Sequence, residues 1–539
     1  MALEVTHICK RTVVSTKAVE PGKYFPLSVL DRYMENNHIR MVYYYQTSRE
    51  VELGKVTKKL RETLSEMLTH FPIVSGRLVR DDETGHWKIK CNDAGVRVVE
   101  AKAKGSVGGW LANLDREKEL QLVHWEDMFH KPYYWSTFYV QLTEFEEGGL
   151  AIGLSCFHLL VDSTCATLFM KAWADISMVN KMITPPLFHH LPPRRPPNRN
   201  PNHHLHMELI HHYKSLIEKP NSTKETMYTT ISMGFSNPMV QACMSMAQPN
   251  GPIPPFEALA ALFWVSLSKV KGLRNRLVDM SICLDMRKVL GLDCTFFGNC
   301  MVYNKVNVEG NNYKFPQVVR AISDVVAKMD TEAIINLTEW LENNDVNSPT
   351  MMNNHNLVCT SLEGMDPYLT VFPDLFKPIH VSYYIEPVVG EGQVLILPGL
   401  PEEGPLSRVA MKEEYELQEG ILASIIALFA EEHKKKANKD ALLATLTDKG
   451  DEEIQDDEVL ASLKTLSTEE VQRKVAKEAT TMDMDGELVP EALILESIKI
   501  RFEEEQRMEE MAGLSRLQSI VENRVELLSL YEVERAKEL

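Results

Sequence analysis

The sequence predicts an α/β protein of two domains with mixed sheets, followed by an acidic helical extension. Over residues 1–436, apolar runs typical of strands alternate with segments of helical periodicity, as in sheets that carry packed helices. A proline-rich basic segment divides this region into two parts. The amino-acid composition changes after residue 436. The chain of 539 residues is long enough for two or three domains with sizeable cores. We therefore expect a first domain over 1–183, a crossover linker over 184–215, a second domain over 216–436 and the extension over 437–539.

The first domain begins with an aromatic strand and an amphipathic helix. Residues 40–46 (RMVYYYQ) are aromatic and β-branched, which is the composition that strands favour. Residues 55–70 carry apolar side chains at helical spacing and predict a helix with one buried face. Further strands are expected after FPIVSGRL, at HWKIKC (86–91), VRVVEA (96–101) and STFYVQLTEF (136–145).

The stretch 144–176 (EFEEGGLAIGLSCFHLLVDSTCATLFMKAWADI) contains the strongest candidate for chemistry. Its apolar run LAIGLSCF predicts a buried strand, and STCATLFMKAWADI predicts a helix with Asp162 or Ser163 as its N-cap. His158 stands between them, where an imidazole could act as a general base. The spacing His-x-x-x-Asp alone is unspecific, because about one chance match is expected with 17 histidines in the chain. A strand-end histidine beside a capping aspartate is therefore an equally good interpretation of this stretch.

The segment 184–202 (TPPLFHHLPPRRPPNRNPN) is rich in proline and arginine, as expected of a linker. Histidines gather in and after it: His189, His190, His203, His204, His206, His211 and His212. A metal site would need acidic or cysteine partners at regular spacing, which this segment lacks, so we interpret it as a solvated linker.

The second domain is expected to contain further alternating helices and strands. IPPFEALAALFWVSLSKVKG (253–272) has proline in its first turn and glycine at its end, which predicts a helix. The remaining expected elements are strands in LVDMSICLDMRKVLG (277–291) and CTFFGNCMVYNKVNV (294–308), one long helix over 316–342, strands at PIHVSYYIEP and QVLILPGL, and a final helix over 411–431.

Composition excludes several classes of function. The formal net charge of −18 argues against nucleic acid as a partner and against simple adhesion to anionic lipid. Nine scattered cysteines without a C-x-x-C pair fit reduced thiols in the cytoplasm and predict no metal site. No signal peptide is recognisable, and the apolar run GILASIIALFA is too short to span a bilayer. Membrane association would therefore come through a partner.

The last hundred residues differ from the rest of the chain. Residues 437–539 carry 26 acidic and 13 basic side chains, and Phe502 and Tyr531 are their only aromatic residues. Residues 437–480 are expected to be partly disordered because they are acidic and weakly apolar. Residues 491–538 place apolar side chains at helical spacing among many charges, which predicts amphipathic helices that pack on the main body or bind a protein partner.

Six segments, in this order along the chain, resemble a known family. They are LSVLD (27–31), LSEMLTHFPIVSGRL (64–78), EFEEGGLAIGLSCFHLLVD (144–162), PFEALAALFW (255–264), DMRKVLG (285–291) and FFGNCMVYN (296–304). Through them, the chain up to about residue 432 resembles the plant BAHD acyltransferases, two-domain relatives of chloramphenicol acetyltransferase. The resemblance implies that family's fold and crossover linker, and the acidic extension lies outside it.

The resemblance also implies roles for three residues. In active BAHD enzymes the motif histidine is the general base that activates a hydroxyl or amine acceptor for attack on an acyl-CoA thioester, and His158 matches it. The family's aspartate is structural and pairs with an arginine of the second domain, as Asp162 and Arg287 would. A carboxylate buried beside a histidine needs such a cationic partner.

The chain departs from the family pattern at two places. Ser163 replaces the usual glycine after the motif aspartate. The second signature, Asp-Phe-Gly-Trp-Gly, is absent from VFPDLFKPIHVSYY (371–384), where Asp374 and Phe376 replace its two glycines. Since glycine tolerates backbone conformations that other residues avoid, the backbone is expected to differ here.

A degenerate second signature beside a retained histidine motif resembles the eceriferum/glossy subgroup. That resemblance implies a role in cuticular wax formation, in which the protein promotes elongation of very-long-chain fatty acyl chains with an elongase condensing enzyme. It also implies a cytoplasmic protein that is peripheral at the endoplasmic reticulum through this partner. Acyl-CoA is then the expected co-substrate, with no permanently bound cofactor.

Three hypotheses follow. The first is a BAHD-fold protein that promotes acyl elongation through partner contacts, motivated by the degenerate signature. The second is an active CoA-dependent acyltransferase with His158 as general base, motivated by the intact His158, Asp162 and Arg287. The third is a scaffold whose C-terminal helices recruit a partner. We favour the first.

Overall fold

A computed structural model describes most of the chain between residues 4 and 428. Its gaps are 18–19, 21, 48–51, 113, 128–133, 192–206, 219–227, 248–252, 274–275, 309–312, 345–355, 376, 389, 400–405, 413–420, 422–423 and 426. The chain divides into two units, residues 1–439 and 440–539, and every element described below belongs to the first. The predicted acidic helical extension lies outside the described residues.

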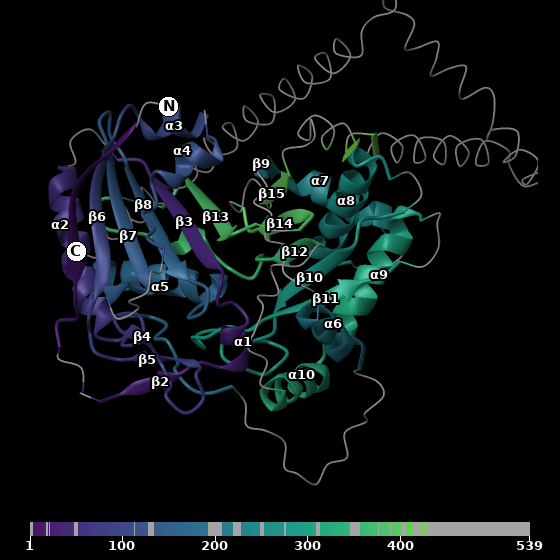
Figure 1. Ribbon diagram of the computed structural model, residues 1–539. Helices are drawn as coiled ribbons and strands as arrows, with labels where there is room; N and C mark the ends of the chain where they lie inside the picture. The colour runs from purple at the N-terminus through teal and green to yellow at the C-terminus, as the bar shows by residue number, and fades with distance from the viewer. Residues whose placement is uncertain are drawn as a thin grey trace, which may run out of the picture. The chain divides into compact units, whose positions relative to one another are not determined.

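The first sheet has six strands in the spatial order β1-β6-β7-β8-β3-β13 (Figure 1). Only β6 and β7 are parallel neighbours, so the sheet is mixed. The strands are β1 (Val5–Val13), β3 (His38–Tyr45), β6 (Val96–Ala103), β7 (Phe138–Phe145), β8 (Leu150–Phe157) and β13 (His380–Glu386). A small three-stranded sheet, in the order β2-β5-β4, consists of β2 (Tyr24–Pro26), β4 (Arg77–Arg80) and β5 (Trp87–Lys90).

Both faces of the first sheet are covered. Alternate residues of β3 belong to different apolar clusters, because successive side chains of a strand point to opposite faces. Helices α2 (Leu53–Leu68) and α5 (Ser163–Val179) pack together on one face, and α3 (Val107–Ala112) and α4 (Arg116–Leu120) lie on the other. Gly153 of β8 permits a close approach there, since a Cβ atom would lie 2.1 Å from the Leu122 carbonyl oxygen.

The second sheet also has six strands, in the order β11-β10-β12-β14-β15-β9, with β12 parallel to β10 and β14. They are β9 (Tyr228–Gly234), β10 (Met280–Asp285), β11 (Met301–Val306), β12 (Leu357–Ser361), β14 (Gly392–Leu397) and β15 (Leu406–Lys412). The remaining elements are α1 (Val29–Arg32), α6 (Met207–Ile217), α7 (Asn237–Ala247), α8 (Pro255–Val270), α9 (Phe315–Lys328), α10 (Thr331–Asn343) and the 3-10 turn Pro367–Leu369.

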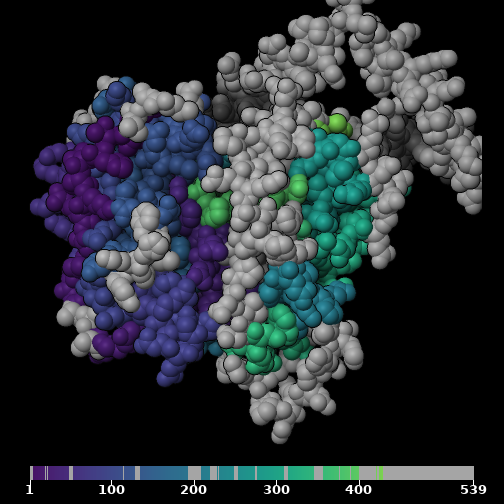
Figure 2. Space-filling view, in the orientation of Figure 1, coloured from purple at the N-terminus to yellow at the C-terminus, as the bar shows by residue number. Residues whose placement is uncertain are grey.

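Strand β13 belongs to the sequence of the second half but pairs with β3 in the first sheet. The antiparallel ladder runs from His380 opposite Tyr44 to Glu386 opposite His38, and the two strands lie side by side in Figure 1. Figure 2 shows the purple-to-blue side chains of the first half and the teal-to-green side chains of the second on opposite sides of this face. The two halves therefore share one sheet, and the predicted domain boundaries stay a prediction.

The predicted α/β class with mixed sheets is confirmed, whereas one local prediction was wrong. The single helix expected over 316–342 is two helices, because Asp330 caps a new one by accepting from the Ala333 N–H at 2.8 Å. The final helix expected near 411–431 lies largely outside the described residues; β15 continues to Lys412, and the described residues from 421 onward are helical. Helix α6 begins at Met207, within the segment predicted to be a linker.

Candidate active site

The histidine motif lies where β8 passes into α5. Strand β8 ends at Phe157, His158 follows it, and α5 begins at Ser163. Asp162 is the N-cap, since its Oδ1 accepts a hydrogen bond from the Cys165 N–H at 3.0 Å. The sequence allowed either Asp162 or Ser163 as the N-cap, and in the structure the N-cap is Asp162.

Asp162 and Arg287, which the resemblance pairs, lie in contact. Arg287 Nη1 donates to Asp162 Oδ2 at 2.8 Å, and Nη2 donates to Oδ1 at 3.0 Å, so the contact is bidentate. Burial alone would raise the pKa of Asp162, but the charge of Arg287 outweighs it and lowers the pKa below its usual range. Although burial opposes its charge, the pKa of Arg287 is raised well above its usual value, mainly by Asp162. Both groups are therefore charged at neutral pH.

A short segment of the second half, residues 296–300, holds both motif residues; we call it the clamp segment. Its Gly298 carbonyl accepts from Arg287 Nη2 at 2.6 Å, and its Cys300 N–H donates to Asp162 Oδ2 at 3.0 Å. The Asn299 side chain donates from Nδ2 to the His158 carbonyl at 2.8 Å. The clamp segment thus fixes the loop between His158 and Asp162 from the other half of the protein.

Asn299 is held in turn by Asp31 of α1. Asp31 Oδ1 accepts from the backbone N–H of Asn299 at 2.9 Å and from its Nδ2 at 2.8 Å. Asp31 Oδ2 accepts from the Ser28 N–H at 2.7 Å, so this buried carboxylate has three donors. The backbone N–H of His158 in turn donates to the Asn37 carbonyl at 2.9 Å. The backbone of His158 is therefore fixed at both its N–H and its carbonyl.

The imidazole of His158 is enclosed and neutral. The residue is 1% exposed, and its Nδ1 has no hydrogen-bond partner within the described ranges. Burial is the main cause that lowers the pKa of His158, against smaller opposing effects that include the charge of Asp162. A neutral imidazole can accept a proton from a hydroxyl or amine. Among the described residues no hydrogen bond joins His158 to Asp162. The Asp162 oxygens accept hydrogen bonds from Arg287, Cys165 and Cys300 instead.

A second buried charge cluster lies next to Asn37. Glu386, at the end of β13, is 4% exposed and bonds three basic side chains of the first half: His38 (3.2 Å), Arg40 (3.1 Å) and Arg116. Trp125 covers His38 with a stacked ring, 4.4 Å between centroids. These ion-paired and aromatic side chains fill the end of the sheet beside the loop that carries His158.

The stretch that replaces the second signature keeps one glycine-like feature. Asp374 has φ of 66°, in the left-handed region that favours glycine and that aspartate tolerates. Phe372 is buried against Trp173 of α5, with 5.1 Å between ring centroids. Asp374 thus has a backbone conformation that glycine adopts readily, whereas Phe376 lies outside the described residues; the expected difference from the family backbone stays a prediction.

Sequence reasoning missed the residues that hold the motif loop. Asn37, Asn299 and Asp31 are at most 4% exposed, and each is a polar residue inside an apolar neighbourhood. The segments LSVLD and FFGNC entered the prediction only through resemblance. A buried polar residue in such a segment was the available signal, because it must be hydrogen-bonded.

Two further observations concern metals and membranes. No group of three or more His, Cys, Asp or Glu side chains that could hold a metal ion occurs among the described residues. Of the clustered histidines, His203, His204 and His206 lie outside those residues. No described helix is both long enough and apolar enough to cross a bilayer.

The chain is similar in sequence to proteins of known name. It is 26% identical to "Protein ECERIFERUM 2" of Arabidopsis thaliana over 73% of this chain and 92% of the relative. It is 25% identical to "Protein ECERIFERUM 26" of the same plant, over 75% of this chain and 91% of the relative. "Rosmarinate synthase" of Plectranthus scutellarioides is also 25% identical, over 73% and 93%.

Solved structures share the fold. Vinorine synthase matches with a TM-score of 0.56 at 17% identity, over 76% of this chain and 95% of that one. F. sporotrichioides TRI101, solved with coenzyme A and T-2, matches with a TM-score of 0.55 at 17% identity, over 72% and 95%. The model of the Transferase family matches residues 3–403. On this evidence the chain belongs to the Transferase family, the BAHD acyltransferases.

Proposed function

We propose that this protein promotes the elongation of very-long-chain fatty acyl chains in cuticular wax biosynthesis, together with an elongase condensing enzyme. It would act at the cytoplasmic face of the endoplasmic reticulum, to which the condensing enzyme would bring it. The similarity to ECERIFERUM 2 and ECERIFERUM 26 supports the wax role. The observation that carries the proposal is the enclosure of His158, which is 1% exposed.

This enclosure argues against simple acyl transfer. A general base must come within hydrogen-bond reach of the proton that it removes. At His158 a substrate could reach the ring only if side chains moved, and the neighbouring sheet end is filled by the ion-paired Glu386 and by Trp125. The ion pair of Asp162 and Arg287 and the clamp segment would then preserve the shape of the body that a partner contacts.

A second function is favoured by a specific observation. His158 is neutral and no described residue is hydrogen-bonded to its Nδ1, so the imidazole could serve as the general base of a CoA-dependent acyl transfer. The acceptor would be a hydroxyl or amine, and Asp162 would position the loop through Arg287. Acyl-CoA as co-substrate is consistent with the fold, because F. sporotrichioides TRI101 was solved with coenzyme A.

Coexpression with a plant elongase condensing enzyme, in a host that makes no wax, separates the two functions. The acyl-chain profile is compared for wild type, His158→Ala and His158→Gln, with the exposed His70→Ala as matched control. The proposal predicts longer chains from all four. Longer chains only from wild type and the control, with all variants folded, would refute it and favour base catalysis.

The extension allows a separate test of partner binding. A chain that ends at residue 436 is compared with the full chain for co-purification of the condensing enzyme. Lost binding with retained folding would assign partner recruitment to the extension, whereas unchanged binding would assign it to the acyltransferase-like body.

A further inference from the structure

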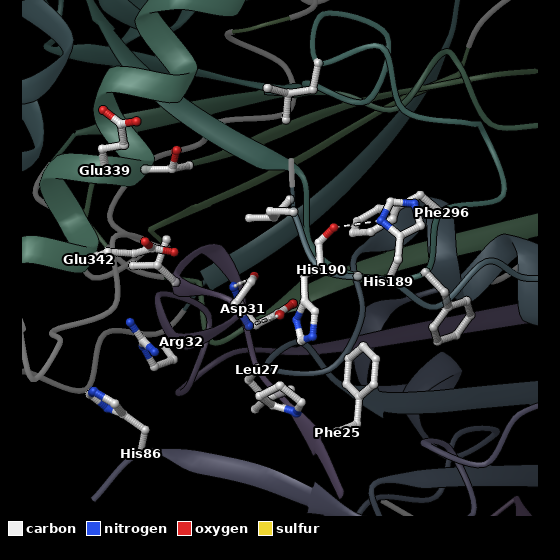
Figure 3. A pocket seen from close by; sticks show the side chains of 18 of the residues that line it. Phe25, Leu27, Asp31, Arg32, His86, His189, His190, Phe296, Glu339 and Glu342 are labelled. Atoms are coloured by element: carbon white, nitrogen blue, oxygen red, sulfur yellow. Dashed lines mark hydrogen bonds between the residues drawn. The ribbon is translucent and has the colours of Figure 1, made fainter. Parts of the chain in front are cut away.

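A cavity of about 360 Å³ lies between the two halves, next to the clamp segment (Figure 3). Its walls come from the first half at β2 and α1, and from the second half at α10 and residues 290–298. Gly298 and Asp31 line it: Gly298 accepts from Arg287, and Asp31 accepts from Asn299, which also donates to the His158 carbonyl. Cavities of this volume are of the size that small ligands occupy.

One charged group of the cavity is left for a ligand. Arg32, half-buried at the end of α1, has no hydrogen-bond or ion-pair partner for its guanidinium among the described residues. The other charged lining groups are engaged: Asp31 accepts three hydrogen bonds, and Glu339 and Glu342 of α10 each have an interaction of their own. An unpaired guanidinium with five donors in a fixed fork suits a carboxylate.

The rest of the lining combines apolar side chains with polar ones, three histidines among them. Phe25 and Phe296 contribute aromatic rings, and Leu290 and Ile335 contribute aliphatic surface. Phe25 lies nearly parallel to His190, at 11° with 6.4 Å between centroids, and forms a flat wall. The charge of the ligand would therefore sit at one end, with an uncharged apolar body against these side chains.

We propose that this cavity binds a monocarboxylate with an apolar body, and that Arg32 pairs with the carboxylate. The negative charges of Glu339 and Glu342 restrict the ligand to a single acidic group, because a second one would meet like charge. Since the cavity wall continues into the clamp segment, an occupied cavity would also restrain the loop of His158. This proposal stands independently of the elongation activity.

Binding to the purified full chain tests the proposal by titration calorimetry. The probe is dodecanoate below its critical micelle concentration. 1-Dodecanol, which has the same chain length and no charge, is the comparison ligand. Variants are Arg32→Gln, Arg32→Lys and Glu342→Gln, and the control is Arg11→Gln, an exposed arginine of β1. Because the Arg32 guanidinium has no hydrogen-bond or ion-pair partner in the described part of the chain, its variants are expected to fold, and circular dichroism checks this.

The expected result is saturable binding of one dodecanoate per chain. 1-Dodecanol should bind about tenfold more weakly, because it cannot form the charged hydrogen bond with Arg32. Arg32→Gln should weaken dodecanoate by about tenfold and leave 1-dodecanol unchanged. Arg32→Lys should retain part of the affinity, Glu342→Gln should increase it, and Arg11→Gln should not change it. Absence of saturable binding, or equal affinity of wild type and Arg32→Gln, would overturn the proposal.

Discussion

Removal of Arg287 should destabilise the protein far more than removal of both members of its ion pair. Asp162 is fully buried, and in Arg287→Met the donors that it keeps among the described residues are the N–H groups of Cys165 and Cys300. Leaving a buried charge without its partner costs about 3–5 kcal/mol. The double variant Arg287→Met/Asp162→Asn leaves no fully buried charge behind, while the partly exposed Asp285, which Arg287 also pairs at 2.7 Å, loses its partner in both variants. We therefore expect the double variant to cost about 2 kcal/mol less than the single variant.

Equilibrium urea unfolding at pH 7 measures these free energies. The matched control is Lys305→Met, which removes an exposed pair with Asp279 at 3.1 Å and should cost less than about 1 kcal/mol. If Arg287→Met also costs less than about 1 kcal/mol, or if the two substitutions are additive, Asp162 is not a buried carboxylate that depends on Arg287.

The pH dependence gives a second check with a defined sign. In the wild type the pKa of Asp162 is lowered, so its contribution is present above the unfolded pKa and is lost as the pH falls through the folded pKa. In Arg287→Met burial should raise that pKa above its unfolded value, so the variant gains stability as the pH falls through the raised pKa. A variant whose stability falls in parallel with that of the wild type would refute the reasoning.

Three further substitutions test other contacts. Asn299→Ala removes the side-chain hydrogen bonds to Asp31 and to the His158 carbonyl. It should lower the free energy of unfolding, measured in urea, by about 2–4 kcal/mol. The exposed control Asn344→Ala should lower it by less than about 0.5 kcal/mol. Burial opposes the charge of Glu386, but the hydrogen bond from His38 and the charges of Arg40 and Arg116 lower its pKa to about 2. Glu386→Gln should therefore be less stable than wild type by about 3 kcal/mol at pH 7, and the difference should vanish as the pH falls from about 4.5 to 2; a constant difference would contradict this. Asp330→Ala removes the N-cap of α10 and should lower the free energy of unfolding by about 1 kcal/mol, measured by thermal unfolding. Asp330→Asn should leave it unchanged, because asparagine is an equally good N-cap.

Local sequence pattern was sufficient to predict the core of the candidate site. An apolar run, a histidine and a capping aspartate before a helical pattern describe β8, His158, Asp162 and α5, because each of these features depends on neighbouring residues. The break between α9 and α10 escaped prediction, since neither glycine nor proline marks it and Asp330 caps the second helix in a chain rich in acidic residues.

Long-range partners could not be read from pattern. HVSYYIE predicts a strand but not the sheet that it joins, and β13 pairs with β3 rather than with a strand of its own half. Likewise, nothing in the spacing of Asp31 and Asn299 links residues that are 268 positions apart. The contact between Asp162 and Arg287 was expected only because the chain resembles a family in which the equivalent residues pair.

The shared sheet has a consequence for the chain during its synthesis. Once β8 has emerged from the ribosome and paired with β3, the other edge of β3 has no partner until β13 follows, about 230 residues later. At ordinary rates of translation that interval is roughly 10–50 s. Throughout it the nascent first half exposes unpaired backbone groups beside aromatic side chains, a surface that chaperones and other strands can bind. The first half therefore cannot complete its fold ahead of the second, and the two must mature together as one cooperative unit.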